Sequence, residues 1–200
     1  MNTVPTESVR LGAERLIDFT RRAFLQVGTS EDNASLIADL LVQTDLRGVF
    51  SHGTRQLDGY TQMIMDQKVN PAPTIQCTES GPTTAVLDGD GGMGHFSAYQ
   101  AAQFTVEKAK AFVIAGAVTR NHFHFGGAGK YSRIALAPTV SVCYLCAPIC
   151  PRCRPVDSVC FWVFAHEFCY SCGRATTSGN RHGSGPRCYW RNLSGPAFSA

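Results

Sequence analysis

The sequence is poor in charged residues and contains no long apolar run. Charged residues make up 16% of the chain and apolar residues 44%, a composition that is typical of globular proteins and argues against a disordered chain. No apolar run approaches the roughly 18 residues of a membrane-spanning helix, and the first residues have no apolar core of signal-peptide length. We therefore expect a soluble, cytoplasmic protein without a membrane partner, whose 200 residues form one or two domains.

The last third of the sequence lacks lysine and any regular period. Residues 138–200 contain six arginines and two acidic residues, whereas residues 1–137 contain 12 basic and 13 acidic residues. Eight of the nine cysteines fall between Cys143 and Cys188. The arginines form no patch on a predicted helix face, so we do not expect a nucleic-acid partner. Translation in a shifted reading frame removes lysine and periodicity together, and we interpret residues 138–200 as an irregular Cys/Arg/Pro/Ser-rich tail, not a folded domain.

The earlier residues follow an α/β pattern. Three amphipathic helices are predicted. The first spans residues 12–27, the second runs from a cap at Ser30 to a stop at Gly48, and the third spans residues 57–67. A strand, "TTAVLDG", and a helix over residues 96–112 follow. A second strand, "VIAGAVT", and a further helix, "YSRIALA", come after them. Helices followed by strand–loop–helix units predict the α/β class, with a single strand–helix–strand unit complete.

A Ser-His pair interrupts this pattern within "DLRGVFSHGTRQLDGY", residues 45–60. Histidine is suited to proton transfer near neutral pH, so His52 is a candidate acid or base. Ser51 can hydrogen-bond the imidazole or a substrate if the chain turns here, because neighbouring side chains point apart in an extended strand. We expect Gly53 to permit that turn.

Two arginines flank the pair. The guanidinium groups of Arg47 and Arg55 are well shaped to hold a carboxylate. The alternative is a loop at a helix end whose His and Arg side chains only cap backbone carbonyls.

A glycine-rich loop, "NHFHFGGAG", spans residues 121–129. Its glycines allow the backbone to approach a ligand closely, and the helix start that follows offers N–H groups to a phosphate. On a strand, His122 and His124 would share one face, which makes a metal site conceivable, but no third ligand is apparent nearby. In "DGDGGMG", residues 88–94, the spacing is not that of a dinucleotide-binding loop, and we interpret its residues as turn formers.

Several motifs occur in the order found in one enzyme family. They are "ADLLVQTDLRGVFSHGTRQLDGY", "NPAP", "VLDGDGGMGHFSAYQA" and "HFGGAGKYSRIA". Over about residues 8–137 the chain resembles the malate/L-lactate dehydrogenase family of NAD(P)-dependent oxidoreductases, which is distinct from the Rossmann-type lactate and malate dehydrogenases. The resemblance implies an incomplete version of that family's α/β fold and hydride transfer between NAD or NADP and a small 2-hydroxy or 2-keto acid. It also implies a homodimer for the full domain.

The resemblance implies roles for individual residues as well. His52 is then the proton donor and Ser51 its relay partner. The family's substrate-binding arginine has its place at Gln56 here, so its neighbour Arg55, or Arg47, is expected to bind the substrate anion. The cofactor is expected to contact His124, Phe125, Gly126, Gly127 and Ala128, and no metal is implied.

Two other readings stay open. Family members are longer than this chain, and the later part of the family pattern is not recognisable after Pro138, so one alternative is an inactive, truncated fragment. The other is a zinc-binding or redox module built by the tail, because C-x-x-C pairs are typical of zinc sites. The cysteines concerned are Cys143, Cys146, Cys150, Cys153, Cys169 and Cys172.

Overall fold

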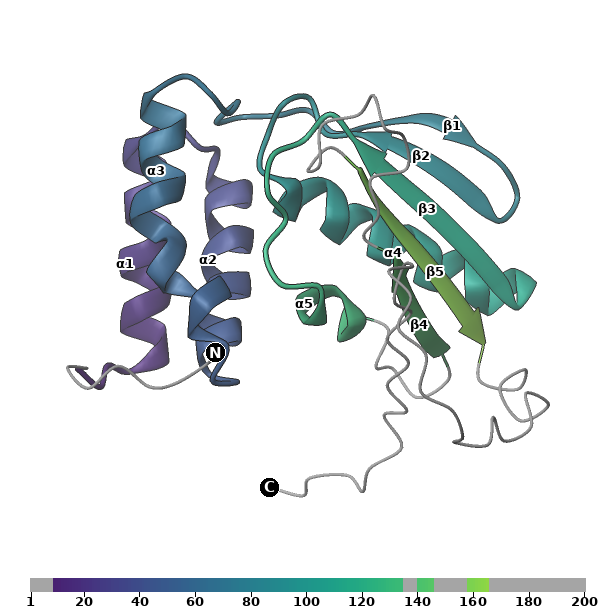
Figure 1. The fold of residues 1–200 in the computed structure, drawn as a ribbon, viewed down its shortest axis with the longest axis horizontal. Coiled ribbons are helices and arrows are strands. Elements are labelled where there is room, and N and C mark those ends of the chain that lie inside the picture. The colour runs from purple at the N-terminus through teal and green to yellow at the C-terminus, as the bar shows by residue number, and fades with distance from the viewer. Residues whose placement is uncertain (1–8, 135–139, 146–157, 166–200) are drawn as a thin grey trace, which may run out of the picture.

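The computed structural model describes residues 9–134, 140–145 and 158–165. Figure 1 shows a bundle of three N-terminal helices beside a sheet that carries the long helix α4 on one face. The helices are α1 (Ala13–Gln26), α2 (Glu31–Asp45), α3 (Leu57–Met65), α4 (Gly94–Phe112) and α5 (Gly129–Ser132), and the short 3₁₀ turns are η1 (Phe50–His52) and η2 (Thr54–Gln56). The strands are β1 (Gln76–Ser80), β2 (Thr84–Asp88), β3 (Ile114–Arg120), β4 (Val140–Leu145) and β5 (Ser158–Ala165).

The three-helix bundle confirms the predicted N-terminal helices. Its core buries apolar residues of α1, α2 and α3 together with Met93 and Phe96 at the start of α4, which ties the bundle to the α/β part. Gly28 follows α1 with φ +91°, as a helix stop requires. Ser30 stands at the N-cap of α2 as predicted; its side chain makes no capping hydrogen bond, and its carbonyl accepts from the Ala34 N–H at 2.8 Å.

The sheet has the strand order β1-β2-β3-β5-β4. Strands β2 and β3 are parallel and are joined through α4, which is the predicted strand–helix–strand unit. Strand β1 was not predicted because Gln76–Ser80 is largely polar; it pairs with β2 alone, at the edge of the sheet. Helix α4 lies close to the sheet because the residues between them are small; they are Ala85, Ala98, Ala101, Ala102 and Ala117.

Two strands lie inside the stretch that the sequence pattern predicts to be irregular. Strand β5 pairs antiparallel with β3, from Ile114 opposite Phe164 to Arg120 opposite Ser158, and β4 continues the sheet beyond β5. The expectation of an irregular tail is therefore wrong for these two segments. Both are rich in β-branched and aromatic residues, "VSVCYL" and "SVCFWVFA", which favour strands when a neighbouring edge is available for pairing.

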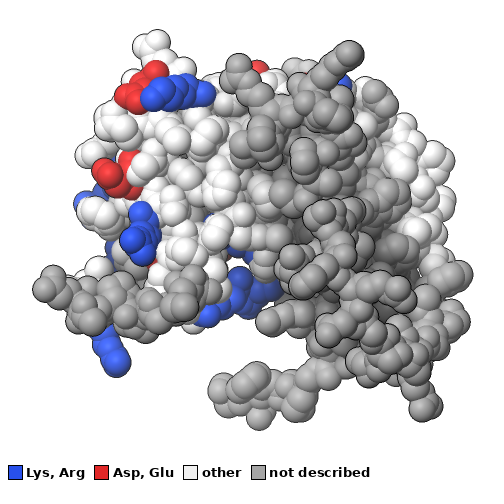
Figure 2. All heavy atoms as spheres, in the orientation of Figure 1, with Lys and Arg blue, Asp and Glu red and all other residues white. Residues whose placement is uncertain are grey.

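Figure 2 shows basic and acidic side chains interspersed over the helical side of the visible face. Among the described residues, no helix combines the length and the apolar character that crossing a membrane requires. The helical bundle and the β2–α4–β3 unit together hold the loops that carry the Ser-His pair and the glycine-rich segment.

Candidate active site

The turn after α2 brings Ser51 and His52 together. Ser51 Oγ lies 2.9 Å from His52 Nδ1, a hydrogen-bonding distance. The pair can hydrogen-bond because η1 curls the backbone, so that two neighbouring side chains approach each other. Gln56 supports the turn from the next element, since its side-chain N–H donates to the Ser51 carbonyl at 2.7 Å. The predicted contact between Ser51 and His52 is thus present in the structure.

Gly53 is required for a different reason from the predicted one. Its φ of −98° is accessible to other residues, so the turn does not depend on a left-handed backbone. A Cβ at this position would lie only 1.7 Å from Asp45 Oδ1. The carboxylate occupies that space because Asp45 Oδ2 accepts hydrogen bonds from the Thr54 backbone N–H at 2.9 Å and from its hydroxyl at 2.5 Å. Asp45 thereby joins the end of α2 to the turn that carries the Ser-His pair.

The glycine-rich loop lies against this turn. The rings of His52 and His124 face each other at a centroid distance of 6.0 Å, tilted by 32°. A Cβ on Gly127 would be 3.6 Å from the Cβ of His52, so the main chain of the loop passes directly beside the imidazole. The structure therefore brings together Ser51, His52, His124 and Gly127, which lie far apart in the sequence.

Tyr60 holds His124 from α3. Its hydroxyl lies 2.8 Å from His124 Nδ1. Burial raises the pKa of Tyr60 well above its ordinary value, so the phenol keeps its proton and is able to donate it to Nδ1. Burial also lowers the pKa of His124, and the nearby His52 and Lys130 act in the same direction, so this imidazole is neutral near pH 7. A neutral ring that accepts at Nδ1 carries its hydrogen on Nε2.

A buried Lys–His pair lies behind the loop. Lys130 Nζ donates to His95 Nε2 at 3.1 Å, and the two residues are 4% and 0% exposed. Burial lowers the pKa of Lys130 to about 7, and the charge of Arg47 adds to this while that of Asp45 opposes it. Burial also lowers the pKa of His95 strongly, helped first by the charge of Lys130. His95 Nδ1 is buried and finds no hydrogen-bond partner among the described residues.

Gly126 fits between the members of this pair. It has φ +76°, and a Cβ there would lie 2.7 Å from His95 Nε2 and 2.8 Å from Lys130 Nζ. Tyr131 fixes the same loop, because its hydroxyl donates to the Phe125 carbonyl. At Gly126 the backbone packs closely against side chains of the protein itself, and the predicted approach of this loop to a ligand stays a prediction.

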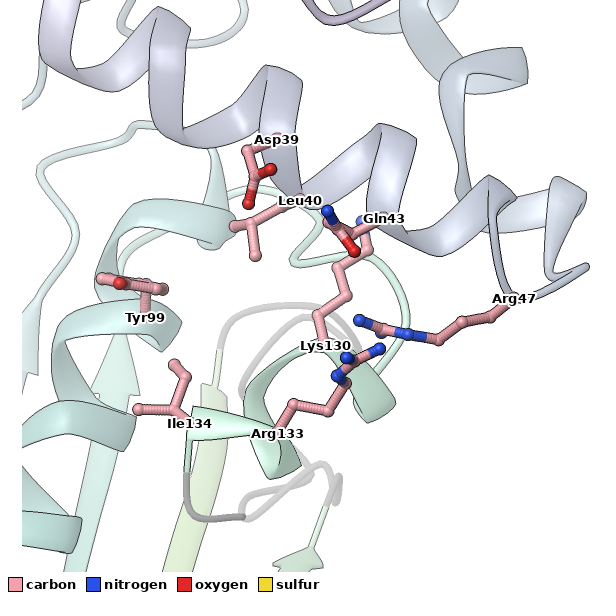
Figure 3. Close-up of a pocket in the computed structure, with 8 residues that line it drawn as sticks. All are labelled: Asp39, Leu40, Gln43, Arg47, Tyr99, Lys130, Arg133 and Ile134. Atoms are coloured by element: carbon pink, nitrogen blue, oxygen red, sulfur yellow. The ribbon is translucent and has the colours of Figure 1, made fainter. Parts of the chain in front are cut away.

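The two predicted arginines occupy different surroundings. Both are exposed, and Arg55 stands on η2. Arg47 also lines a pocket of about 240 Å³ together with Lys130 and Arg133 (Figure 3).

Sequence reasoning missed four residues of this region. Asp45, Tyr60, His95 and Lys130 each contact or support the two loops, and each comes from a different helix or helix end. Tyr60 and Asp45 stand at the two ends of the segment already singled out, but a sequence pattern does not show that one reaches His124 and the other Thr54. A histidine after a glycine turn, as in "GMGHF", is a weak signal by itself.

The histidines of the glycine-rich loop do not share a face. Both follow the end of β3, and His122 contacts Thr119 Oγ1 at 2.9 Å through Nε2, whereas His124 faces Tyr60. The described residues contain no group of three or more side chains placed to hold a metal. Side chains of the tail cysteines lie outside the described residues, so the zinc interpretation stays a prediction.

The acidic glycine loop has the predicted structural role. Asp88 Oδ1 accepts from the Asp90 N–H at 2.9 Å and from the Asn121 side chain at 2.8 Å. A Cβ on Gly92 would lie 2.3 Å from Cγ of Pro73, and one on Gly94 would lie 2.4 Å from the Phe123 carbonyl oxygen. These residues therefore fix tight packing between β2, α4 and the loop after β3.

Comparisons with known proteins agree on one family. The profile of the malate/L-lactate dehydrogenase family matches residues 11–146. The chain is 38% identical over 127 residues to malate dehydrogenase of Pyrococcus abyssi, which covers 64% of this chain and 35% of that protein. It is 38% identical over 109 residues to L-sulfolactate dehydrogenase of Methanocaldococcus jannaschii, covering 54% of this chain and 32% of that one.

A solved structure matches the fold as well. The malate dehydrogenase of Pyrococcus horikoshii OT3 superimposes with a TM-score of 0.67 at 34% identity, over 72% of this chain and 42% of that one. The chain thus spans about a third of the length of the curated relatives named above.

Proposed function

The chain belongs to the malate/L-lactate dehydrogenase family, and on that premise we propose that it carries the acid–base corner of a nicotinamide-dependent oxidoreductase. The reaction is the interconversion of a small 2-hydroxy acid and its 2-keto acid. Its relatives are named for malate and for sulfolactate, both small hydroxy acids, which supports this substrate class.

The observation that carries the proposal is the placement of His52 against the glycine-rich loop. His52 and His124 face each other at 6.0 Å, and the main chain at Gly127 runs beside the His52 ring. A cofactor held by residues 124–128 would therefore lie next to the candidate acid, as a redox reaction at one carbon requires. NAD or NADP, when bound, supplies or takes up the hydride.

The side chains supply proton transfer and orientation. In the oxidation direction His52 accepts the proton of the substrate hydroxyl, and in the reduction direction it returns that proton to the carbonyl oxygen. Ser51 orients the imidazole through their 2.9 Å contact. His124 offers its Nε2–H as a neutral hydrogen-bond donor, because Tyr60 occupies Nδ1. Arg55 is the candidate for the substrate carboxylate, since its guanidinium is exposed on the element that follows His52.

The test separates cofactor binding from turnover. Binding of NADH and NADPH to the 200-residue chain is measured by fluorescence titration, and oxidation of malate, lactate and sulfolactate by absorbance of the reduced cofactor. His52→Gln is expected to lower turnover by about a hundred- to ten-thousandfold while cofactor affinity stays the same. Turnover that His52→Gln leaves unchanged would overturn the role of His52. A chain that binds neither cofactor would instead support the inactive-fragment alternative.

A further inference from the structure

Two cationic side chains converge on one pocket beside α5. Arg47 reaches it from the end of α2 and Arg133 from α5, whereas Lys130 contributes to the wall and its ammonium is directed past Gln43 to His95 (Figure 3). The pocket has a volume of about 240 Å³ and also contains the amide of Gln43. Its other wall is largely apolar and consists of Leu40, Tyr99 and Ile134, with Asp39 at the edge.

The positive charges of this pocket outnumber the negative ones. Asp39 is the single acidic residue of the lining, against two arginines and a lysine. The charge of Arg133 lowers the pKa of Arg47, in addition to the effect of burial, so the two guanidinium groups repel each other. Both arginines are exposed, and like charges held close together at a hollow repel each other unless an anion lies between them.

We propose that this pocket binds a small phosphate monoester, with the phosphate held by Arg47 and Arg133 and the organic part against Tyr99 and Ile134. A phosphate dianion accepts hydrogen bonds from several directions at once, which suits two guanidinium forks arriving from different elements. The apolar wall matches a ligand with an organic body better than a bare inorganic ion. The inference does not rest on the proposed dehydrogenase function, and it assigns Arg47 to this second anion.

The experiment is isothermal titration calorimetry of the full chain with adenosine 5′-monophosphate and with inorganic phosphate. We expect saturable one-to-one binding of the monoester and weaker binding of inorganic phosphate. Arg133→Gln, at an exposed position, is expected to weaken monoester binding by about tenfold or more. Arg47→Gln is expected to weaken it to a similar extent.

The matched control is Arg15→Gln, which removes the same charge from an exposed position on α1 and should leave the affinity unchanged. Circular dichroism spectra of all variants verify folding. Absence of saturable binding by the wild-type chain overturns the proposal, and so does an equal loss in Arg15→Gln and Arg133→Gln, which indicates a general charge effect. Equal affinity for inorganic phosphate and the monoester overturns the assignment of an organic ligand.

Discussion

Asp45 and Thr54 are joined by two hydrogen bonds to one carboxylate oxygen, across the turn that carries Ser51 and His52. The pair is half-buried and lies where α2 passes into η1 and η2. The acid–base pair is consequently held by a side chain that has no part in the chemistry. Its contribution can be separated from that of His52, because stability and turnover are measured independently.

Asp45→Ala is expected to lower the free energy of unfolding by about 1–3 kcal/mol, because it leaves the half-buried Thr54 N–H without its acceptor. Thr54→Val keeps that N–H and removes only the hydroxyl donor, so its loss should be smaller, about 0.5–1.5 kcal/mol. Urea denaturation measures both. Glu107→Ala, an exposed site on α4, is the control and should change stability by less than about 0.5 kcal/mol. A loss in the control as large as that in Asp45→Ala would contradict this role of Asp45.

Gly126→Ala is expected to destabilise the fold and weaken cofactor binding. The left-handed backbone alone costs on the order of 1–2 kcal/mol for a residue with a side chain. The new Cβ would also displace the buried pair of His95 and Lys130, from which it would stand 2.7 and 2.8 Å away. Gly129→Ala is the matched control in the same loop, since nothing lies within 4 Å of a Cβ there. Thermal unfolding and NADH titration should single out Gly126→Ala, and equal behaviour of the two variants would refute the steric argument.

Tyr60→Phe is expected to change His124 from one ring tautomer to a mixture of two. With the protonated phenol as donor to Nδ1, we expect the ring hydrogen of the wild type on Nε2. Without that donor the ring should populate both tautomers, and nitrogen-15 chemical shifts of the imidazole report the change. The stability loss should be about 0.5–1.5 kcal/mol. Tyr99→Phe is the control, and a wild-type tautomer in Tyr60→Phe would show that the hydroxyl does not set it.

Lys130 should make the stability of the chain depend on pH. Its pKa in the folded chain is about 7, below the ordinary 10.5, so between these values the unfolded chain carries a proton that the folded chain lacks. Unfolding then takes up a proton, and the free energy of unfolding rises with pH across this window, by at most about 1.4 kcal/mol per pH unit. Below pH 7 both states are protonated and the contribution is constant.

Urea denaturation at pH 7 and pH 9.5, in a buffer free of phosphate and sulfate, measures this rise. Lys130→Met should lack the part of the rise that Lys130 causes, and Lys110→Met, at an exposed position on α4, should retain it. The same rise in Lys130→Met as in the wild type would show that another group is responsible.

The spacing of apolar residues, together with helix-capping and turn residues, was enough to predict most of the helices and strands. Apolar spacing located the helices of the N-terminal bundle, and the strand–helix–strand unit followed from two short apolar runs on either side of an alanine-rich helix. These signals are local, because a helix or strand must place its apolar residues at its own period to bury one face. Strands β1, β4 and β5 were not predicted. A polar segment such as β1, or a segment without polar–apolar alternation such as β4 or β5, forms a strand only when a neighbouring strand is available for pairing.

By itself, the sequence determined the chemistry available to the site: a Ser-His pair, a glycine-rich loop with a histidine, and the order of motifs that resembles one family. Only the tertiary structure decided which of these groups meet. It set His52 against His124, placed Tyr60 on His124, buried Lys130 against His95, and turned Arg47 toward Arg133 in a separate pocket. Such contacts join residues that are distant along the chain, so they depend on how whole helices and strands pack, and a local pattern of residue types carries no record of that packing.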